Sequence, residues 1–309
     1  MNITVLAGGD SPEREVSLTS GRCVSTALVK KGHTVKIVDP ARENLCRHVI
    51  ENRPDCVFIA LHGGSGEGGA VQGFLETAGI PYTGSDTGAS ALCLNKILSK
   101  TLLAAENIPT PGFHRIDPGH GKPENPFGFP VVVKPARLGS TIGISIVREE
   151  KSLPEAVTRA LSYDTLVFLE RYVPGTEVTV SILGNTTPRV LPMIQIETPS
   201  GFYDYRAKYT PGGSTHRIPP ALEDAVLDRI GAVSLETYRV LGCCGFARTE
   251  LIVDRRGNPF VIDVNTIPGL TETSLFPDSA RAAGIEFDEL CETLVQLGIE
   301  KWTGRRENA

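Results

Sequence analysis

Short apolar runs alternate with helical patterns over the first 90 residues. The apolar runs lie at 3–6, 35–38 and 57–60, and helical patterns separate them. This alternation predicts βαβ units and a parallel sheet, with binding loops at the carboxyl ends of the strands. Two loops in such positions, at 8–15 and 62–69, are rich in glycine and charged or polar residues.

The pattern changes near residue 90 and again near residue 175. The middle segment has a helix around Lys96, a Pro/Gly-rich connection and short apolar strands. The last segment starts with period-two alternation at 177–182 and continues through a Gly/Pro-rich loop, a helix, two strands and a helical tail. The predicted fold class is therefore α/β with three domains. Their ranges are 1–90 for the βαβ domain, 91–175 for a small α+β domain and 176–309 for a larger α+β domain.

Composition narrows the possible partners and compartment. The chain has 31 Lys and Arg against 36 Asp and Glu, a net charge of −5, which argues against nucleic acid as a partner. The apolar runs are far shorter than the roughly 18 residues of a membrane span. No basic segment precedes the first apolar run, so we expect a cytoplasmic protein. The seven cysteines show no C-x-x-C spacing, and we expect them to be small buried residues.

A hairpin with a turn centred on residues 256–257 carries the clearest chemistry. Antiparallel pairing around that turn brings four polar side chains to one face: Arg248, Glu250, Asp263 and Asn265. Glu250 then opposes Asp263, and two such carboxylates repel unless a cation lies between them. Oxygen ligands of this kind suit Mg²⁺ that is held together with substrate phosphates. The alternative is an ordinary solvated polar face of the sheet, and the Gly/Pro loop at 265–271, directly after the second strand, argues against it.

Six motifs extend the pattern over the chain, and they lie at 8–17 (GGDSPEREVS), 62–67 (HGGSGE), 82–85 (YTGS), 133–143 (VKPARLGSTIG), 202–209 (FYDYRAKY) and 265–271 (NTIPGLT). In order and spacing, they resemble those of the D-alanine–D-alanine ligases of the ATP-grasp superfamily. The resemblance covers essentially the whole chain. It implies a three-domain ATP-grasp architecture in which ATP lies between the central and C-terminal domains.

The resemblance also implies a nucleotide site and a metal site. Lys96 and Lys134 are expected to hold ATP phosphates, close to a glycine loop whose backbone N–H groups can approach phosphate. The remaining residues implied for nucleotide binding are Glu170, Tyr172 and Val173 at the adenine hinge, Glu177 at the ribose, and Lys208. The ions expected are two Mg²⁺ or Mn²⁺. Their ligands are Glu250, Asp263 and Asn265.

For the substrate, the resemblance implies that Glu15 receives the ammonium group of the first D-alanine. Ser140 and Tyr209 are expected to link this acid to a mobile loop, and His62 to contact the same substrate. The residues expected at the carboxylate of the second D-alanine are Lys208 and Ser274. Arg248 and the backbone N–H of Gly269 are the candidates for stabilising the oxyanion of the tetrahedral intermediate.

The reaction implied is ATP-dependent ligation of two D-alanines through an acyl phosphate, which serves peptidoglycan precursor synthesis. An acyl phosphate hydrolyses when it is wet, so a lid is required, and the Gly/Pro-rich segment 205–219 is the candidate. A homodimer is expected from the resemblance alone. No membrane partner is expected.

Some positions depart from the family pattern. Glu250 and Asp263 exchange the usual order of Asp and Glu. The other departures are Gly68, Asn95, Tyr172 and Arg206, and they leave other small amino or hydroxy acids open as substrates. A nicotinamide-dependent oxidoreductase is a further alternative, but residues 8–13 lack G-x-G-x-x-G. A nucleotide-binding protein without turnover is the last alternative, and metal-dependent ATP turnover excludes it.

Overall fold

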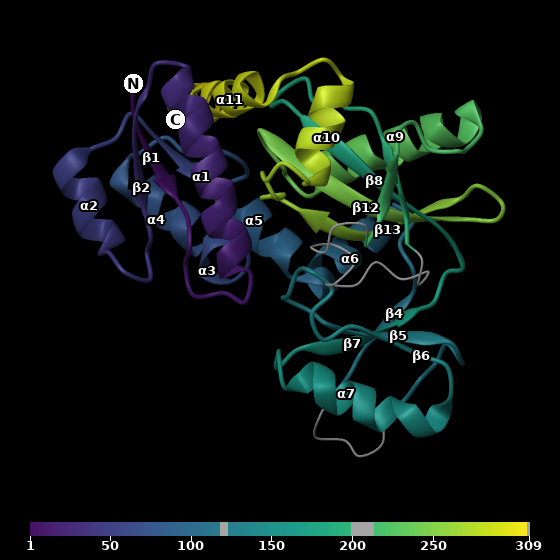
Figure 1. The fold of residues 1–309 in the computed structure, drawn as a ribbon. Coiled ribbons are helices and arrows are strands. Elements are labelled where there is room, and N and C mark those ends of the chain that lie inside the picture. The colour runs from purple at the N-terminus through teal and green to yellow at the C-terminus, as the bar shows by residue number, and fades with distance from the viewer. Residues whose placement is uncertain (118–122, 199–212, 308–309) are drawn as a thin grey trace.

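The computed structural model describes residues 1–117, 123–198 and 213–307. The first sheet is parallel, with strand order β2-β1-β3, and Figure 1 shows α1 running beside it. This confirms the predicted βαβ start. Its strands are β1 (Asn2–Leu6), β2 (Thr34–Val38) and β3 (Cys56–Ile59), and its helices are α1 (Arg14–Lys30), α2 (Leu45–Asn52), α3 (Gly64–Glu67) and α4 (Ala70–Ala78).

The second sheet is antiparallel, with strand order β4-β7-β5-β6. The helix α7 packs against it and covers its outer face in Figure 1, because the apolar face of α7 is buried over strands whose side chains are also buried. The elements of this unit are β4 (Phe113–Arg115), β5 (Val131–Pro135), β6 (Ser145–Val147), the 3₁₀ turn η1 (Glu150–Ser152), α7 (Leu153–Leu161) and β7 (Val167–Arg171).

The third sheet is antiparallel, with strand order β11-β10-β8-β12-β13 and β9 paired to β8. The helix α9 packs on one face of it and leaves the other face toward the second sheet. The strands are β8 (Gly175–Leu183), β9 (Arg189–Val190), β10 (Ile194–Glu197), β11 (Thr215–Arg217), β12 (Phe246–Asp254) and β13 (Pro259–Asn265). The remaining helices are α5 (Thr87–Leu94), α6 (Lys96–Ala105), α9 (Asp224–Val240), α10 (Leu275–Ala282) and α11 (Phe287–Glu307).

Two helices pack across the boundaries that the sequence suggests. Leu103 of α6 lies in the core of the third sheet, although it belongs to the predicted central segment. Leu290 and Leu294 of α11 lie in one core with Val5 and Phe58 of the first sheet. A shift in composition marks where the pattern changes, but it does not tell which sheet an apolar helix face will cover.

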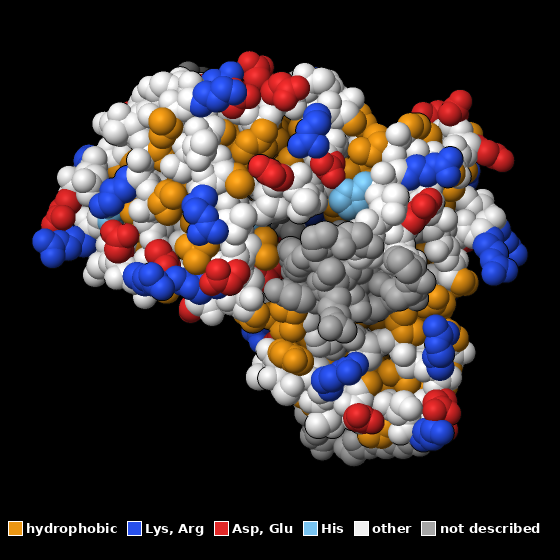
Figure 2. All heavy atoms as spheres, viewed as in Figure 1, with side chains coloured by type: hydrophobic (Ala, Val, Ile, Leu, Met, Phe, Trp, Pro, Cys, Tyr) orange, Lys and Arg blue, Asp and Glu red, His pale blue; other side chains and the backbone are white. Residues whose placement is uncertain are grey.

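The surface shown in Figure 2 is mixed in charge, and the cysteines differ in burial. On the face shown in Figure 2, Lys and Arg side chains are interspersed with Asp and Glu. In the described parts of the chain, no helix is long and apolar enough to cross a bilayer. The seven cysteines are free thiols, and Cys56, Cys93, Cys243 and Cys291 are buried. The expectation of burial is wrong for Cys46, which is exposed on α2.

Candidate active site

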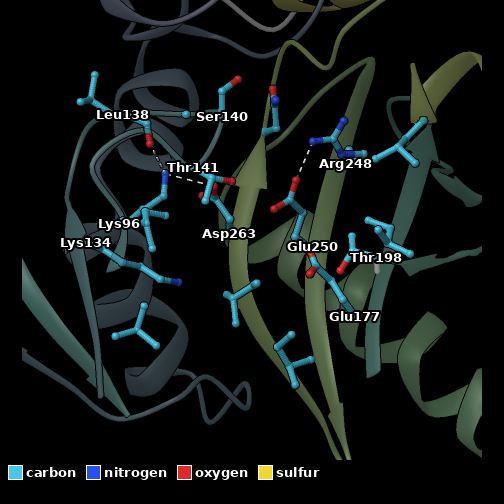
Figure 3. Close-up of a pocket in the computed structure, with 18 of the residues that line it drawn as sticks. Lys96, Lys134, Leu138, Ser140, Thr141, Glu177, Thr198, Arg248, Glu250 and Asp263 are labelled. Atoms are coloured by element: carbon cyan, nitrogen blue, oxygen red, sulfur yellow. Dashed lines mark hydrogen bonds and ion pairs between the residues drawn. The ribbon is translucent and has the colours of Figure 1, made fainter. Parts of the chain in front are cut away.

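A pocket of about 470 Å³ lies where the three sheets meet. Figure 3 shows part of this pocket, with Lys96 and Lys134 on one side and the β12–β13 hairpin on the other. The lining residues with ionisable side chains come from all three parts of the chain: Glu13, His62, Lys96, Lys134, Glu170, Arg171, Glu177, Glu197, Arg248, Glu250 and Asp263. A cavity of this size with convergent polar groups is the expected form of a small-molecule site.

The β12–β13 hairpin has the predicted pairing at its functional end. Arg248 lies opposite Asn265 and Glu250 opposite Asp263, and all four residues line the pocket. The register shifts by one residue between Glu250 and Leu251, so the turn is not centred quite where the sequence suggests. Ile262 has no partner on β12 and forms a β-bulge, which accounts for the one-residue shift in register. As a result two consecutive residues, Ile262 and Asp263, line the pocket.

Each carboxylate of this hairpin is paired with a cation. Arg248 donates to Glu250 over 2.6 Å, and Lys96 Nζ lies 3.0 Å from Asp263 Oδ2 (Figure 3). Burial alone favours the neutral amine of Lys96, but Asp263, Glu67 and Glu250 outweigh it and raise its pKa. The amine is therefore charged at neutral pH, and it also donates to Leu138 O in the glycine loop over 3.0 Å.

The donor set fits a divalent ion that is completed by ligands from outside the protein. Within the described ranges, no three His, Cys, Asp or Glu side chains gather closely enough to form a metal site alone. Glu250, Asp263 and Asn265 nevertheless all line the pocket, and Figure 3 shows the Glu250 and Asp263 side chains on neighbouring strands of the hairpin. Mg²⁺ accepts one or two protein carboxylates together with phosphate oxygens, so these residues suit the metal that the sequence predicts.

The residues expected around a nucleotide come from the segment between the second and third sheets and from β8. Tyr172 and Val173 line the pocket between β7 and β8, and Glu177 lines it from β8, where it lies opposite Ile252 of β12. Lys134 Nζ lies 2.5 Å from Glu170 Oε1, so this lysine forms an ion pair inside the protein. The glycine loop between β5 and β6 has Ser140 and Thr141 at φ values of 52° and 62°, left-handed conformations that residues with a side chain rarely adopt.

The two acids of the first motif, Glu13 and Glu15, lie in different surroundings. Glu15 is exposed in the first turn of α1 and does not line the pocket. Glu13, two residues earlier, lines it and accepts a hydrogen bond from Ser140 Oγ. The helix dipole favours an acid at either position. Only Glu13, which precedes the helix, contacts the loop between β5 and β6, through Ser140. Both acids belong to one motif, so the motif alone does not distinguish them.

A second acid of the same region was not singled out from the sequence. Glu67 is buried on α3, and burial together with the nearby Glu13 raises its pKa to about 7. One of its carboxylate oxygens accepts a hydrogen bond from Gly63 N over 2.9 Å. The loop at 62–69 therefore brings a second, partly protonated carboxyl group close to Glu13.

The other substrate residues converge on the same end. His62 is buried, and its Nε2 is hydrogen-bonded to Ser20 Oγ at 3.3 Å. The same hydroxyl accepts from Leu270 N, which fixes the loop that carries Gly269. Ser274 begins α10, yet its hydroxyl accepts from Thr271 N inside the pocket wall and does not cap the helix. A Cβ atom at Gly269 would lie 2.8 Å from Ser274 Oγ, so this position requires glycine.

At two of the positions that depart from the family pattern, Asn95 and Gly68, the local structure explains the residue. Asn95 caps α6 by accepting from Ile97 N and Leu98 N, a role that an aspartate would also fill. A Cβ atom at Gly68 would lie 2.8 Å from Gly64 O, so the loop leaves no room for a side chain. Tyr172 lines the pocket. Lys208, Tyr209, Arg206 and part of the predicted lid lie outside the described residues.

Two antiparallel sheets border one pocket, with Lys134 on the first of them, a carboxylate-bearing hairpin on the other, and Lys96 on helix α6, and this arrangement defines the chain as an ATP-grasp protein. Family models for the D-ala D-ala ligase N-terminus and C-terminus match residues 42–85 and 107–296. The chain belongs to the D-alanine–D-alanine ligase family.

Individual relatives agree with this assignment. A D-alanine–D-alanine ligase of Moorella thermoacetica is 49% identical, over 97% of this chain and all of the relative. That of Desulforudis audaxviator is 48% identical, over 97% of this chain and 99% of the relative. The crystal structure of D-alanine–D-alanine ligase from Bacillus anthracis complexed with ATP has a TM-score of 0.85 and 32% identity, and the match covers 99% of both chains. The oxidoreductase alternative is therefore excluded.

Proposed function

We propose that this protein joins two D-alanine molecules to D-alanyl-D-alanine at the expense of ATP, for the synthesis of peptidoglycan precursors. The observation that carries this proposal is the hairpin pair Arg248–Glu250 and Asp263–Asn265 facing Lys96 across one pocket. The full-length relatives named as D-alanine–D-alanine ligases, and the ATP complex of a structural neighbour, support it.

ATP would lie along the pocket between the second and third sheets. Tyr172 and Val173 would meet the adenine through backbone groups, and Glu177 would accept a ribose hydroxyl. Lys96 and Lys134 would bind the phosphates, because a compact ammonium group suits an oxygen-rich anion. Glu250, Asp263 and Asn265 would hold Mg²⁺, which supplies charge neutralisation at the phosphates. We propose two ions.

The first D-alanine would bind at the end of the pocket formed by Glu13 and His62. Glu13 carries the negative charge that an ammonium group requires, and Ser140 orients it. In the first step a carboxylate oxygen of this D-alanine attacks the γ-phosphorus of ATP and ADP leaves. Arg248 stabilises the charge on the transferring phosphoryl group, since it is buried and faces the site.

In the second step the neutral amine of another D-alanine attacks the acyl carbon. The tetrahedral intermediate carries an oxyanion, and Arg248 together with the backbone N–H of Gly269 would stabilise it. Phosphate then leaves with the electrons of the acyl C–O bond. Ser274, with Lys208, would hold the carboxylate of the second D-alanine, and Tyr209 in the lid segment would close over the intermediate.

The setting of the reaction follows from the same family relationship. We propose a cytoplasmic homodimer, acting on small molecules and without nucleic acid or membrane partners. Cell-wall biogenesis and cell shape would depend on its product.

The test is phosphate release from Mg-ATP with D-alanine, L-alanine, D-serine and D-lactate in parallel, with mass determination of each product. We expect turnover with D-alanine and a product of the mass of D-alanyl-D-alanine. Omission of Mg²⁺ should abolish that turnover. Turnover with only one of the other acids would contradict the substrate and favour another ATP-grasp ligase. The absence of turnover with all four would contradict the enzymatic role.

A further inference from the structure

Three buried charges form a cluster behind the nucleotide side of the pocket. Lys100 Nζ lies 2.7 Å from Glu170 Oε2, and Lys134 Nζ lies 2.5 Å from Glu170 Oε1. Glu170 therefore divides its carboxylate between two lysines. The side chains are almost entirely buried, with exposed fractions of 2% for Lys100, 8% for Lys134 and 4% for Glu170. Charges at this depth are seldom screened by water or salt.

The three members of the cluster face different surroundings. Lys134 and Glu170 line the pocket, whereas Lys100 lies behind them and does not line it. Lys100 also donates to Thr110 Oγ1 over 2.5 Å and lies 5.8 Å from the centre of the Phe113 ring. Burial lowers the pKa of Lys100, and the adjacent Glu170 opposes that shift. Lys100 is thus held on the protein side and cannot itself reach a ligand in the pocket.

Two lysines share one carboxylate in this cluster, and Lys134 is the one of the two that faces the pocket. If Glu170 had Lys134 as its single partner, the two charges would cancel and the carboxylate would hold the amine. Because Lys100 takes one carboxylate oxygen, Glu170 is already partly neutralised when it meets Lys134. An anion that enters the pocket can then compete for Lys134 at a smaller cost.

We infer that Lys100 is a positioning residue for the nucleotide: by sharing Glu170, it keeps Lys134 available to the phosphate groups of ATP. This inference rests on the proposed function insofar as the ligand is ATP. Lys100 touches neither substrate nor metal, and it acts through Glu170.

The placement of Lys100 on α6 adds a second connection. Lys96, at the start of the same helix, is four residues away, and residues so spaced lie on one helix face. Lys96 contacts Asp263 of β13, and Thr110 donates to Val261 O of the same strand. Through Lys100 and Lys96, one helix therefore ties the second sheet, which carries Lys134, to the metal-binding hairpin of the third.

The test compares the variant Lys100→Met with the double variant Lys100→Met/Glu170→Gln. In Lys100→Met, Glu170 keeps Lys134 as partner, so no buried charge is left alone, but Lys134 is withheld from phosphate. We expect the KM for ATP and the dissociation constant for ADP to rise about ten-fold, with a smaller change in kcat. In the double variant the carboxylate that holds Lys134 is gone, and we expect ADP to bind more tightly than it binds to Lys100→Met.

The recovery separates positioning from a general structural role, because a second substitution in a damaged core would add to the loss. A matched control is Lys151→Met, which removes the same charge from an exposed lysine of the second unit and should leave both constants unchanged. Lys100→Gln, which keeps a donor to Glu170 without the charge, carries the same expectation should the Met variant not accumulate.

Two results would overturn the inference: an unchanged dissociation constant for ADP in Lys100→Met, or a double variant that binds ADP no better than Lys100→Met. ADP binding is measured by calorimetry without D-alanine. A failure of the wild-type protein to ligate D-alanine would therefore count against the proposed function alone, and the comparison of variants would still decide the role of Lys100.

Discussion

Arg248→Met should lower kcat/KM for dipeptide formation by about a thousand-fold, with the folded structure retained. Arg248 is buried, it faces the pocket, and its guanidinium donates to Glu250 over 2.6 Å. The substitution removes the cation that would meet the transferring phosphoryl group and the later oxyanion. It also leaves Glu250 beside Asp263 without its nearest cation, so the two carboxylates repel each other more strongly. Both effects act on the rate of the chemical steps.

Steady-state kinetics, with thermal unfolding measured alongside, checks this expectation. The matched control is Arg255→Met, an exposed arginine in the turn of the same hairpin, which should change kcat/KM by less than about two-fold. A loss smaller than ten-fold in a folded Arg248→Met protein would mean that Arg248 is a structural partner of Glu250 and has no direct role in the reaction.

Glu13→Gln should raise the D-alanine concentration that half-saturates ATP hydrolysis about a hundred-fold, whereas Glu15→Gln should leave it unchanged. The two acids lie two residues apart in one motif, so they form a natural pair of test and control. Glu13 faces the pocket and accepts from Ser140 Oγ, while Glu15 points to solvent from the first turn of α1. A glutamine at position 13 keeps the size of the side chain but offers no charge to the ammonium group.

The same titration of ATP hydrolysis against D-alanine measures both variants. Equal values for Glu13→Gln and the wild type would contradict the assignment of the ammonium site to Glu13. A large increase for Glu15→Gln would restore the residue that sequence reasoning selected. The KM for ATP is measured in the same assay and shows whether either substitution also affects nucleotide binding.

Local sequence patterns were sufficient to predict the hairpin and the strands of the sheets. The alternation of strands and helices predicted a parallel sheet, whose order β2-β1-β3 only the structure shows, and antiparallel pairing predicted that Glu250 opposes Asp263. The predicted turn centre was slightly wrong, and the β-bulge beside the site compensated for it. The four polar residues share one face in either register, which is why the prediction survived the error.

Features that depend on packing between distant segments could not be predicted from the sequence. The choice between Glu13 and Glu15 is made by the glycine loop at Ser140, more than 100 residues away. The role of Lys100 requires β7 to place Glu170 against it, and nothing in the periodicity of α6 marks that lysine as buried. The return of α11 to the first sheet likewise follows from which apolar faces remain uncovered.

In the proposed reaction a D-alanine carboxylate is activated by phosphorylation, and the amine of a second D-alanine then displaces the phosphate. The most direct measurement uses D-alanine labelled with ¹⁸O in its carboxylate, with mass analysis of the phosphate released from unlabelled ATP. We expect one ¹⁸O atom in each phosphate, because the oxygen that attacks the γ-phosphorus leaves with it, and D-alanyl-D-alanine as the other product. Phosphate without ¹⁸O, or release of pyrophosphate, would contradict an acyl-phosphate intermediate.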